Sequence, residues 1–141
     1  MNIVFINFSV YGGCSGVHIH FLANALQDRG HRCYVILPVE GSEPDYFGTP
    51  RYTFLSVNEA ATLLRGNSPL LQDSIFHAWT PREVPRRLTQ GLARIAGRPY
   101  FVHLEDNEEY ILEKLHHMPY AELEREVRAG RITCSEAFCN P

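Results

Sequence analysis

The sequence lacks the features that would place it in several common classes of protein. Its 13 Lys and Arg residues do not outnumber its 16 Asp and Glu residues, so the net charge of −3 provides no basic field for nucleic acid. No apolar run approaches the roughly 20 residues of a transmembrane helix. The apolar start also lacks the preceding basic segment that a signal peptide has. We therefore expect neither a nucleic-acid partner nor a membrane span.

Cysteine is also sparse. The four cysteines form no C-x-x-C pair, which is the spacing typical of zinc sites, so we expect no metal site. Isolated cysteines in a chain with a sizeable core are typical of reduced thiols in the cytosol, which predicts a cytoplasmic protein. These cysteines are Cys14, Cys33, Cys134 and Cys139.

What the sequence does contain is typical of one globular domain. Its 141 residues, of which 45% are hydrophobic, are enough to bury a real core. Apolar segments predicted to be strands alternate with segments of helical periodicity, joined by short connections. This alternation indicates an α/β fold, a Rossmann-like doubly wound parallel sheet in three α/β/α layers, over residues 1–141. The expected strands are residues 2–8, 33–37, 52–55, 74–79 and 100–104.

Several helix boundaries can be predicted from capping residues. Thr80, Pro81 and Glu83 match the pattern of a capping box with proline at the first helical position. Asn58 and Asn107 are expected to cap two further helices. Four glycines are expected to end helices: Gly30, Gly66, Gly97 and Gly130.

A ligand of such a sheet would lie beyond the carboxyl ends of the strands, where the strand order reverses. Three turns should meet there: residues 11–16 after the first strand, Trp79 and Thr80 after the fourth, and residues 105–107 after the fifth. Each turn leads into a helix N-terminus, whose unpaired N–H groups attract anions. These turns are the expected binding site.

The first of these turns contains Gly12, Gly13 and Gly16. Either the glycines permit positive φ and close packing of helix on strand, or they let a phosphate or sugar approach the backbone. Their G-G-x-x-G spacing differs from the G-x-G-x-x-G of NAD-binding loops, and no lysine follows as in a Walker loop. The spacing leaves both interpretations open.

Polar side chains beside the turns are candidates for the substrate cleft. Glu105, Asp106 and Asn107 could bond sugar hydroxyls or act as bases, although Asn107 and Asp106 also suit helix capping. His18 falls on the inward stripe of its helix, either bonded within the core or pointing into the cleft, whereas His20 is expected on the opposite, solvated side.

The positions of the remaining histidines and arginines indicate structural or surface roles. His77 and His103 lie within predicted strands, so core or supporting roles are expected for them. Five arginines are expected on the solvent side of one helix, as a solvated face or as a peripheral contact with anionic lipid headgroups. They are Arg82, Arg86, Arg87, Arg94 and Arg98.

Three segments together resemble a known family. Residues 2–38, including LANALQDRGH, resemble the opening strand, glycine-rich loop and first helix of GT-B fold glycosyltransferases in the large retaining group called family 4. SIFHAWTP resembles that family's strand and histidine-bearing turn, and RPYFVHLEDNEE resembles its next strand and acidic turn.

The resemblance implies a two-domain enzyme that moves a sugar from a nucleotide-sugar donor to a sugar or lipid-linked acceptor, with no cofactor. This chain would be the N-terminal, acceptor-side domain, inactive without the C-terminal donor domain and prone to self-association where that domain should dock. The family's glycine loop approaches the donor phosphates, which here points to Gly12, Gly13, Ser15 and Gly16. The resemblance assigns no catalytic residue.

The chain departs from the family pattern at two turns. Glu105 precedes Asp106 where the family often has histidine then aspartate, so the role of that histidine is not carried over. Trp79 stands where a second histidine is frequent, and could be a stacking platform for a sugar ring or simply pack. Two other functions stay open: a stand-alone Rossmann-like binding or regulatory domain, and an NAD-dependent enzyme with Glu40 on a ribose.

Overall fold

The computed structural model describes residues 1–8, 11–38, 48–66, 68–104 and 106–133. The chain forms two compact units, Met1–His103 and Leu104–Pro141. In chain order the elements are β1 (Asn2–Ile6), α1 (Cys14–Asp28), β2 (Arg32–Leu37), β3 (Thr53–Ser56), α2 (Val57–Arg65), α3 (Pro69–Gln72), β4 (Ser74–Ala78), α4 (Glu83–Ala96), β5 (Tyr100–Val102), α5 (Glu108–His116) and α6 (Tyr120–Arg128).

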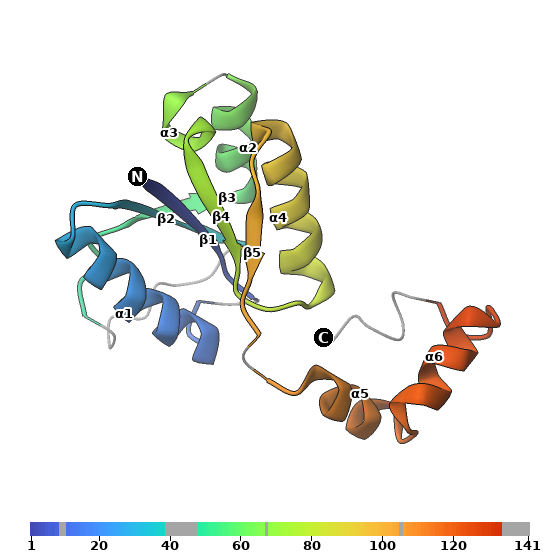
Figure 1. Ribbon diagram of the computed structural model, residues 1–141. Coiled ribbons are helices and arrows are strands. Elements are labelled where there is room, and N and C mark those ends of the chain that lie inside the picture. The colour runs from blue at the N-terminus through green and yellow to red at the C-terminus, as the bar shows by residue number, and fades with distance from the viewer. Residues whose placement is uncertain (9–10, 39–47, 67, 105, 134–141) are drawn as a thin grey trace. The chain divides into compact units, whose positions relative to one another are not determined.

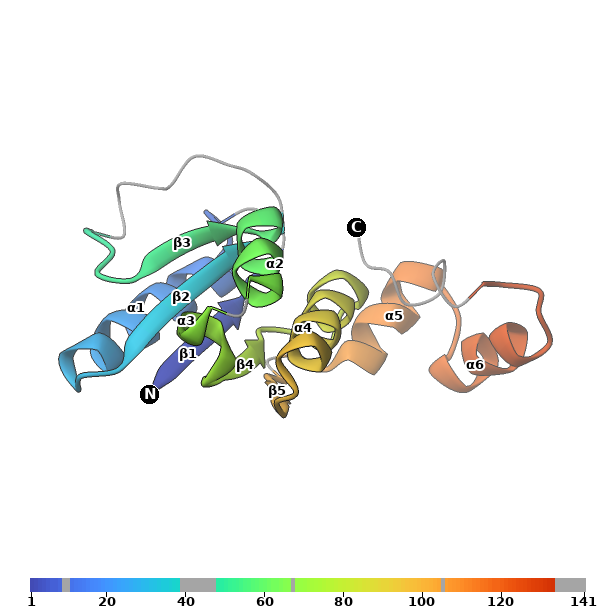
Figure 2. The ribbon, with the colours of Figure 1, turned by 90° about the horizontal axis from the view of Figure 1, so that it is seen from above.

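The first unit contains a five-stranded sheet in the order β3-β2-β1-β4-β5. Every neighbouring pair of strands is parallel, and Figure 2 shows the strands side by side in this order. The order reverses between β1 and β4, because the chain leaves β1 toward β2 and later returns to the other side of β1. The predicted α/β, Rossmann-like parallel sheet is therefore confirmed.

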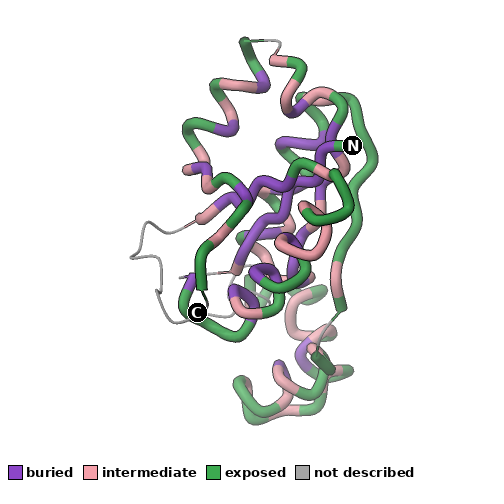
Figure 3. Tube along the Cα trace, turned by 90° about the vertical axis from the view of Figure 1, so that its left-hand side faces the viewer, coloured by how far each residue is buried: buried purple, intermediate pink, exposed green. Residues whose placement is uncertain are grey.

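Helices cover both faces of this sheet, as the prediction of three layers requires. Helix α1 lies on one face, and α2 and α4 lie on the other (Figure 1). Side chains alternate along β1, so Ile3 and Phe5 pack on the α1 side whereas Val4 and Ile6 pack on the α4 side. Both sets are buried, and Figure 3 shows how burial concentrates along the central strands.

One capping box forms, but at a different helix from the one predicted. The Ser56 hydroxyl accepts from the Glu59 N–H, while the Glu59 carboxylate accepts from the Ser56 N–H, so Ser56 rather than Asn58 caps α2. At the predicted box, the Thr80 hydroxyl accepts from the N–H of Arg82, two residues on, and α4 begins only at Glu83. The carboxylate of Glu83 instead forms ion pairs with Arg86 and Arg87.

The other predicted boundaries agree closely with the structure. Asn107 caps α5 by accepting from the Tyr110 N–H at 3.1 Å. Gly97 ends α4 in the left-handed conformation, with φ of 64°. The short helix α3 was not predicted, because its few residues are too short for helical periodicity to appear.

The second unit is a pair of helices, α5 and α6, packed through Leu112 and Leu123. The Glu113 carboxylate accepts from the Tyr120 N–H at 2.9 Å and so satisfies one of the free donors at the start of α6. Among the described residues of both units, no helix is long and apolar enough to cross a bilayer.

Candidate functional site

The candidate site lies at the carboxyl edge of the sheet, beyond β1 and β4, the two neighbouring strands between which the strand order reverses. Hydrogen bonds continue one residue past each strand: the Trp79 N–H donates to the Ile6 carbonyl at 3.1 Å, and the His103 N–H donates to the Ala78 carbonyl at 2.8 Å. Asn7 follows β1 in the same way, and its side chain is fully buried. The backbone ladder therefore fixes Asn7, Trp79 and His103 at one edge.

Around the indole of Trp79 lies a group of rings that we call the Trp79 cluster: Phe5, His18, His77, Trp79 and His103. The His103 imidazole stacks on the indole, with centroids 4.4 Å apart and planes 15° from parallel. His77 lies 5.4 Å from the indole centroid, and His18 meets it edge-on at 6.2 Å. Strands β1 and β4, the residue after β5, and the first turns of α1 thus supply one contiguous cluster.

The electrostatics of this cluster favour neutral imidazole at its centre. The pKa of His77 is lowered, first because burial penalises the imidazolium and second because a charge on His103, 5.7 Å away, would repel it. His77 therefore remains neutral at pH 7.

Contacts join the segments that flank two of the three predicted turns. The Arg82 guanidinium, in the turn after β4, lies over the Phe8 ring after β1 at 4.5 Å, and His18 of α1 reaches Trp79. Of the third turn, Glu105 lies outside the described residues. Asp106 and Asn107 belong to the second unit, so their part in the site stays a prediction.

The glycine-rich bend serves packing at one position and leaves backbone exposed at others. A Cβ on Gly16 would lie 1.7 Å from the Tyr11 carbonyl oxygen, so Gly16 is needed for close packing of the bend on its helix. Gly13 is the N-cap of α1 with φ of −82°, which any residue can adopt, so positive φ is not its reason. Gly12 and Gly13 are exposed, which is what an approaching phosphate requires.

Three other predicted site residues are largely enclosed. Ser15 is buried in the first turn of α1. Thr80 is buried, and its hydroxyl accepts from Arg82 within the turn. Trp79 is 2% exposed and stacked on His103, so its ring packs and offers no open face to a sugar.

Of the two histidines of α1, His20 was predicted on the solvated side, and this prediction is wrong. His20 is 2% exposed, and its ring nitrogens lie within hydrogen-bond distance of Tyr52 and Asn24. His18 is exposed, although its ring edge touches Trp79. The imidazole of His18 is therefore exposed near the bend, whereas the imidazole of His20 is structural.

Sequence reasoning missed two members of this edge. Asn7 was taken as part of the first strand, yet it is the first residue beyond β1 and the only polar residue in the apolar run from Ile3 to Phe8, a signal that could have drawn notice. His103 was placed inside the fifth strand, but β5 ends at Val102 and the imidazole joins the Trp79 cluster.

Among the described residues, no group of three His, Cys, Asp or Glu side chains is arranged to hold a metal ion. Of the described cysteines, Cys14 is exposed at the start of α1 and Cys33 is buried in β2. Burial raises the pKa of the Cys33 thiol to about 11, so that thiol is not a nucleophile at neutral pH.

Comparison with known proteins adds little to this geometry. No protein-family model and no curated protein matches the chain. Two crystal structures of S. aureus homoserine dehydrogenase, at pH 6.0 and pH 7.0, align over 96% of the chain with 14% and 15% identity and a TM-score of 0.30 each. The chain spans 47% and 46% of those chains, about half their length. Similarity this weak informs neither fold nor activity.

Proposed function

We propose that this chain is the acceptor-side domain of a glycosyltransferase that uses a nucleotide-sugar donor, and that the donor's phosphates approach the glycine-rich bend. One observation carries the proposal: exposed Gly12 and Gly13 stand at the N-terminus of α1, the helix whose His18 meets Trp79 after β4, and the strand order reverses between β1 and β4. The resemblance of residues 2–38 to family 4 glycosyltransferases supports the choice of ligand.

The bend has the physical properties of an anion site. Helix α1 has 15 residues, and its first N–H groups have no partner within the helix, so a partial positive charge faces the bend. Gly13 caps the helix without a side chain, and no acidic residue occupies the first turn. A diphosphate could accept from these N–H groups without meeting a carboxylate in the first turn of α1.

In sugar transfer, such preorganised donors would stabilise the negative charge that develops on the departing nucleotide diphosphate. The resemblance assigns most of the remaining donors to a C-terminal domain. We therefore predict that these 141 residues bind nucleotide without transferring sugar. Sugar transfer by this chain alone would overturn the assignment to an acceptor-side domain.

Trp79 offers a direct binding assay, because it is the sole tryptophan of the chain and His18 links its ring to the first turns of α1. We would titrate the protein with UDP, GDP, their glucose conjugates and NAD, and follow Trp79 emission. Saturable changes with the nucleotide sugars support the proposal. Saturation by NAD alone favours the NAD-dependent enzyme, and no response to any probe favours the stand-alone domain.

Two substitutions at the N-cap locate the binding. Gly13→Ser and Gly13→Asp both supply good capping side chains at a φ that any residue adopts, so both should fold at least as stably as the parent. Only the aspartate places a negative charge where the phosphate would lie. We expect the dissociation constant of Gly13→Ser for the nucleotide sugar to lie within a few-fold of the parent's. The dissociation constant of Gly13→Asp should be at least tenfold higher. Equal binding by both variants would place the ligand elsewhere.

A further inference from the structure

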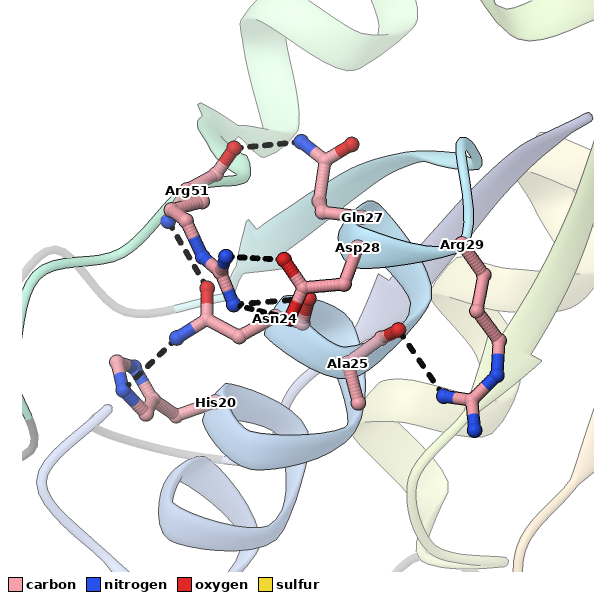
Figure 4. Close-up of polar contacts among 7 residues, drawn as sticks. All are labelled: His20, Asn24, Ala25, Gln27, Asp28, Arg29 and Arg51. Atoms are coloured by element: carbon pink, nitrogen blue, oxygen red, sulfur yellow. Dashed lines mark hydrogen bonds and ion pairs between the residues drawn. The ribbon is translucent and has the colours of Figure 1, made fainter.

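The buried His20 is the centre of a network that joins three parts of the first unit. Its Nδ1 lies 3.0 Å from the Tyr52 hydroxyl, ahead of β3, and 3.4 Å from the Tyr11 hydroxyl, in the glycine-rich bend. Its Nε2 lies 3.1 Å from the side-chain amide nitrogen of Asn24, one turn further along α1. Figure 4 shows how this face of α1 holds Arg51, which precedes Tyr52.

The orientation of the Asn24 amide decides which nitrogen of His20 carries the proton. The Arg51 backbone N–H donates to Asn24 Oδ1 at 2.9 Å, and a backbone N–H can only donate. Asn24 Nδ2 therefore faces His20 and donates to Nε2, which must be an unprotonated acceptor. The imidazole proton then lies on Nδ1, where it is donated toward Tyr52.

The backbone of residue 51 is itself well anchored. The Arg51 guanidinium forms an ion pair with Asp28 and donates to the Asn24 carbonyl at 3.2 Å. Gln27 donates to the Arg51 carbonyl. Three side chains of α1 therefore hold Arg51 in the position that orients the Asn24 amide.

The same network reaches the bend through Tyr11. The Tyr11 ring meets Phe54 of β3 edge-on at 4.8 Å, its hydroxyl reaches His20, and its carbonyl lies against Gly16. We propose that His20, held as the Nδ1–H tautomer by Asn24, is a positioning residue that fixes the glycine-rich bend to α1 and to the segment before β3. The importance of His20 for a ligand rests on the function proposed above. The hydrogen-bond geometry around His20 is independent of that function.

The tautomer can be read without any ligand, from long-range proton–nitrogen NMR correlations of the imidazole rings at neutral pH. The parent should show His20 as Nδ1–H, the minor tautomer of histidine in water. Asn24→Asp keeps an oxygen for the Arg51 N–H but turns an acceptor toward Nε2, so its His20 should carry a proton on Nε2. Asn58→Asp makes the same change at an exposed position of α2 and should leave the His20 signals unchanged. A parent His20 protonated on Nε2 would overturn the assignment.

Positioning of the bend is tested by the backbone amide signals of Gly12 and Gly13. His20→Gln and Tyr11→Phe should each shift both signals, whereas Asn58→Asp should not. Unshifted amides in both variants would show that His20 supports only the core and would overturn the positioning role. Failure of nucleotides to bind would instead count against the proposed function, and would leave the tautomer and the amide shifts as they are.

Discussion

Gly16 and Tyr11 lie so close together in the glycine-rich bend that residue 16 has no room for a side chain. The position of a Cβ on Gly16, in the first turn of α1, lies 1.7 Å from the carbonyl oxygen of Tyr11, which is far inside any real contact. The obstacle is backbone, so no side-chain rotation can relieve it. Gly91 in α4 is the opposite case, since a Cβ there would meet nothing within 4 Å. The same substitution at these two helical glycines should therefore have opposite effects.

We predict that Gly16→Ala lowers the free energy of unfolding by about 2 kcal/mol or more, because the bend must move away from the helix. Gly91→Ala should raise it by about 0.5 to 1 kcal/mol, because alanine loses less backbone entropy in a helix than glycine does. Urea unfolding followed by circular dichroism measures both. A Gly16→Ala variant as stable as the parent would contradict the close packing of the Tyr11 carbonyl against residue 16.

A second prediction distinguishes the observed cap of α2 from the one expected from sequence. Ser56→Ala removes the hydroxyl that accepts from Glu59 and should cost about 1 kcal/mol of the free energy of unfolding. Asn58→Ala, inside the first turn and exposed, should change it by less than about 0.5 kcal/mol. Thermal denaturation of the two variants decides between them, since a larger loss at Asn58 would restore the sequence-based cap.

The sheet could be predicted from sequence because the same feature, a short apolar run, recurs at each strand. Each strand is a short apolar run, and parallel strands buried on both faces need no alternation to be recognised. Capping was less predictable because the same S/T-x-x-E pattern occurs at Ser56 as well as at Thr80. Only the structure shows that the Thr80 hydroxyl is used within its own turn, so that α4 starts later.

The phase of α1 could not be read from periodicity, because apolar residues occur on several of its sides. The predicted inward stripe through His18 includes Phe21 and Leu22, three and four residues on, yet both are exposed. The buried face of the helix instead carries small or hydrogen-bonded residues: Ser15, Gly16, Ile19, His20 and Ala23. Close packing selects the small ones, and His20 is buried because its partners come from segments distant in sequence, which no local pattern reveals.

The lowered pKa of His77 predicts how stability depends on pH. Because the folded state holds this imidazole neutral while the unfolded chain protonates it near the usual value of about 6.5, folding releases a proton below that pH. His77 therefore contributes full stability above pH 6.5, and this contribution is lost as the pH falls from there through the lowered pKa of the folded state. His77→Gln should show a smaller drop in its urea midpoint between pH 7.5 and pH 5 than the parent. An equal or larger drop would mean that His77 is protonated in the folded protein.

Self-association is expected to use the outer edge of β5. Among the described residues no strand pairs with that edge, and Tyr100, Phe101 and Val102 are all exposed. Because the His103 N–H bonds to β4 and backbone direction alternates along a strand, the N–H and C=O groups of Tyr100 and Val102 point outward. An unpaired apolar edge of this kind is a template for another strand.

Antiparallel pairing of two copies centred on Phe101 would place Tyr100 opposite Val102 of the second copy and satisfy these outward groups on both chains. Phe101→Lys should therefore abolish a concentration-dependent increase in mass measured by light scattering. Phe21→Lys is the matched control, because Phe21 in α1 is 62% exposed and Phe101 is 58% exposed, so both remove a similar apolar surface and add the same charge. A parent protein that stays monomeric at high concentration would contradict self-association. Equal disruption by both variants would mean that general surface hydrophobicity, and not the β5 edge, holds the copies together.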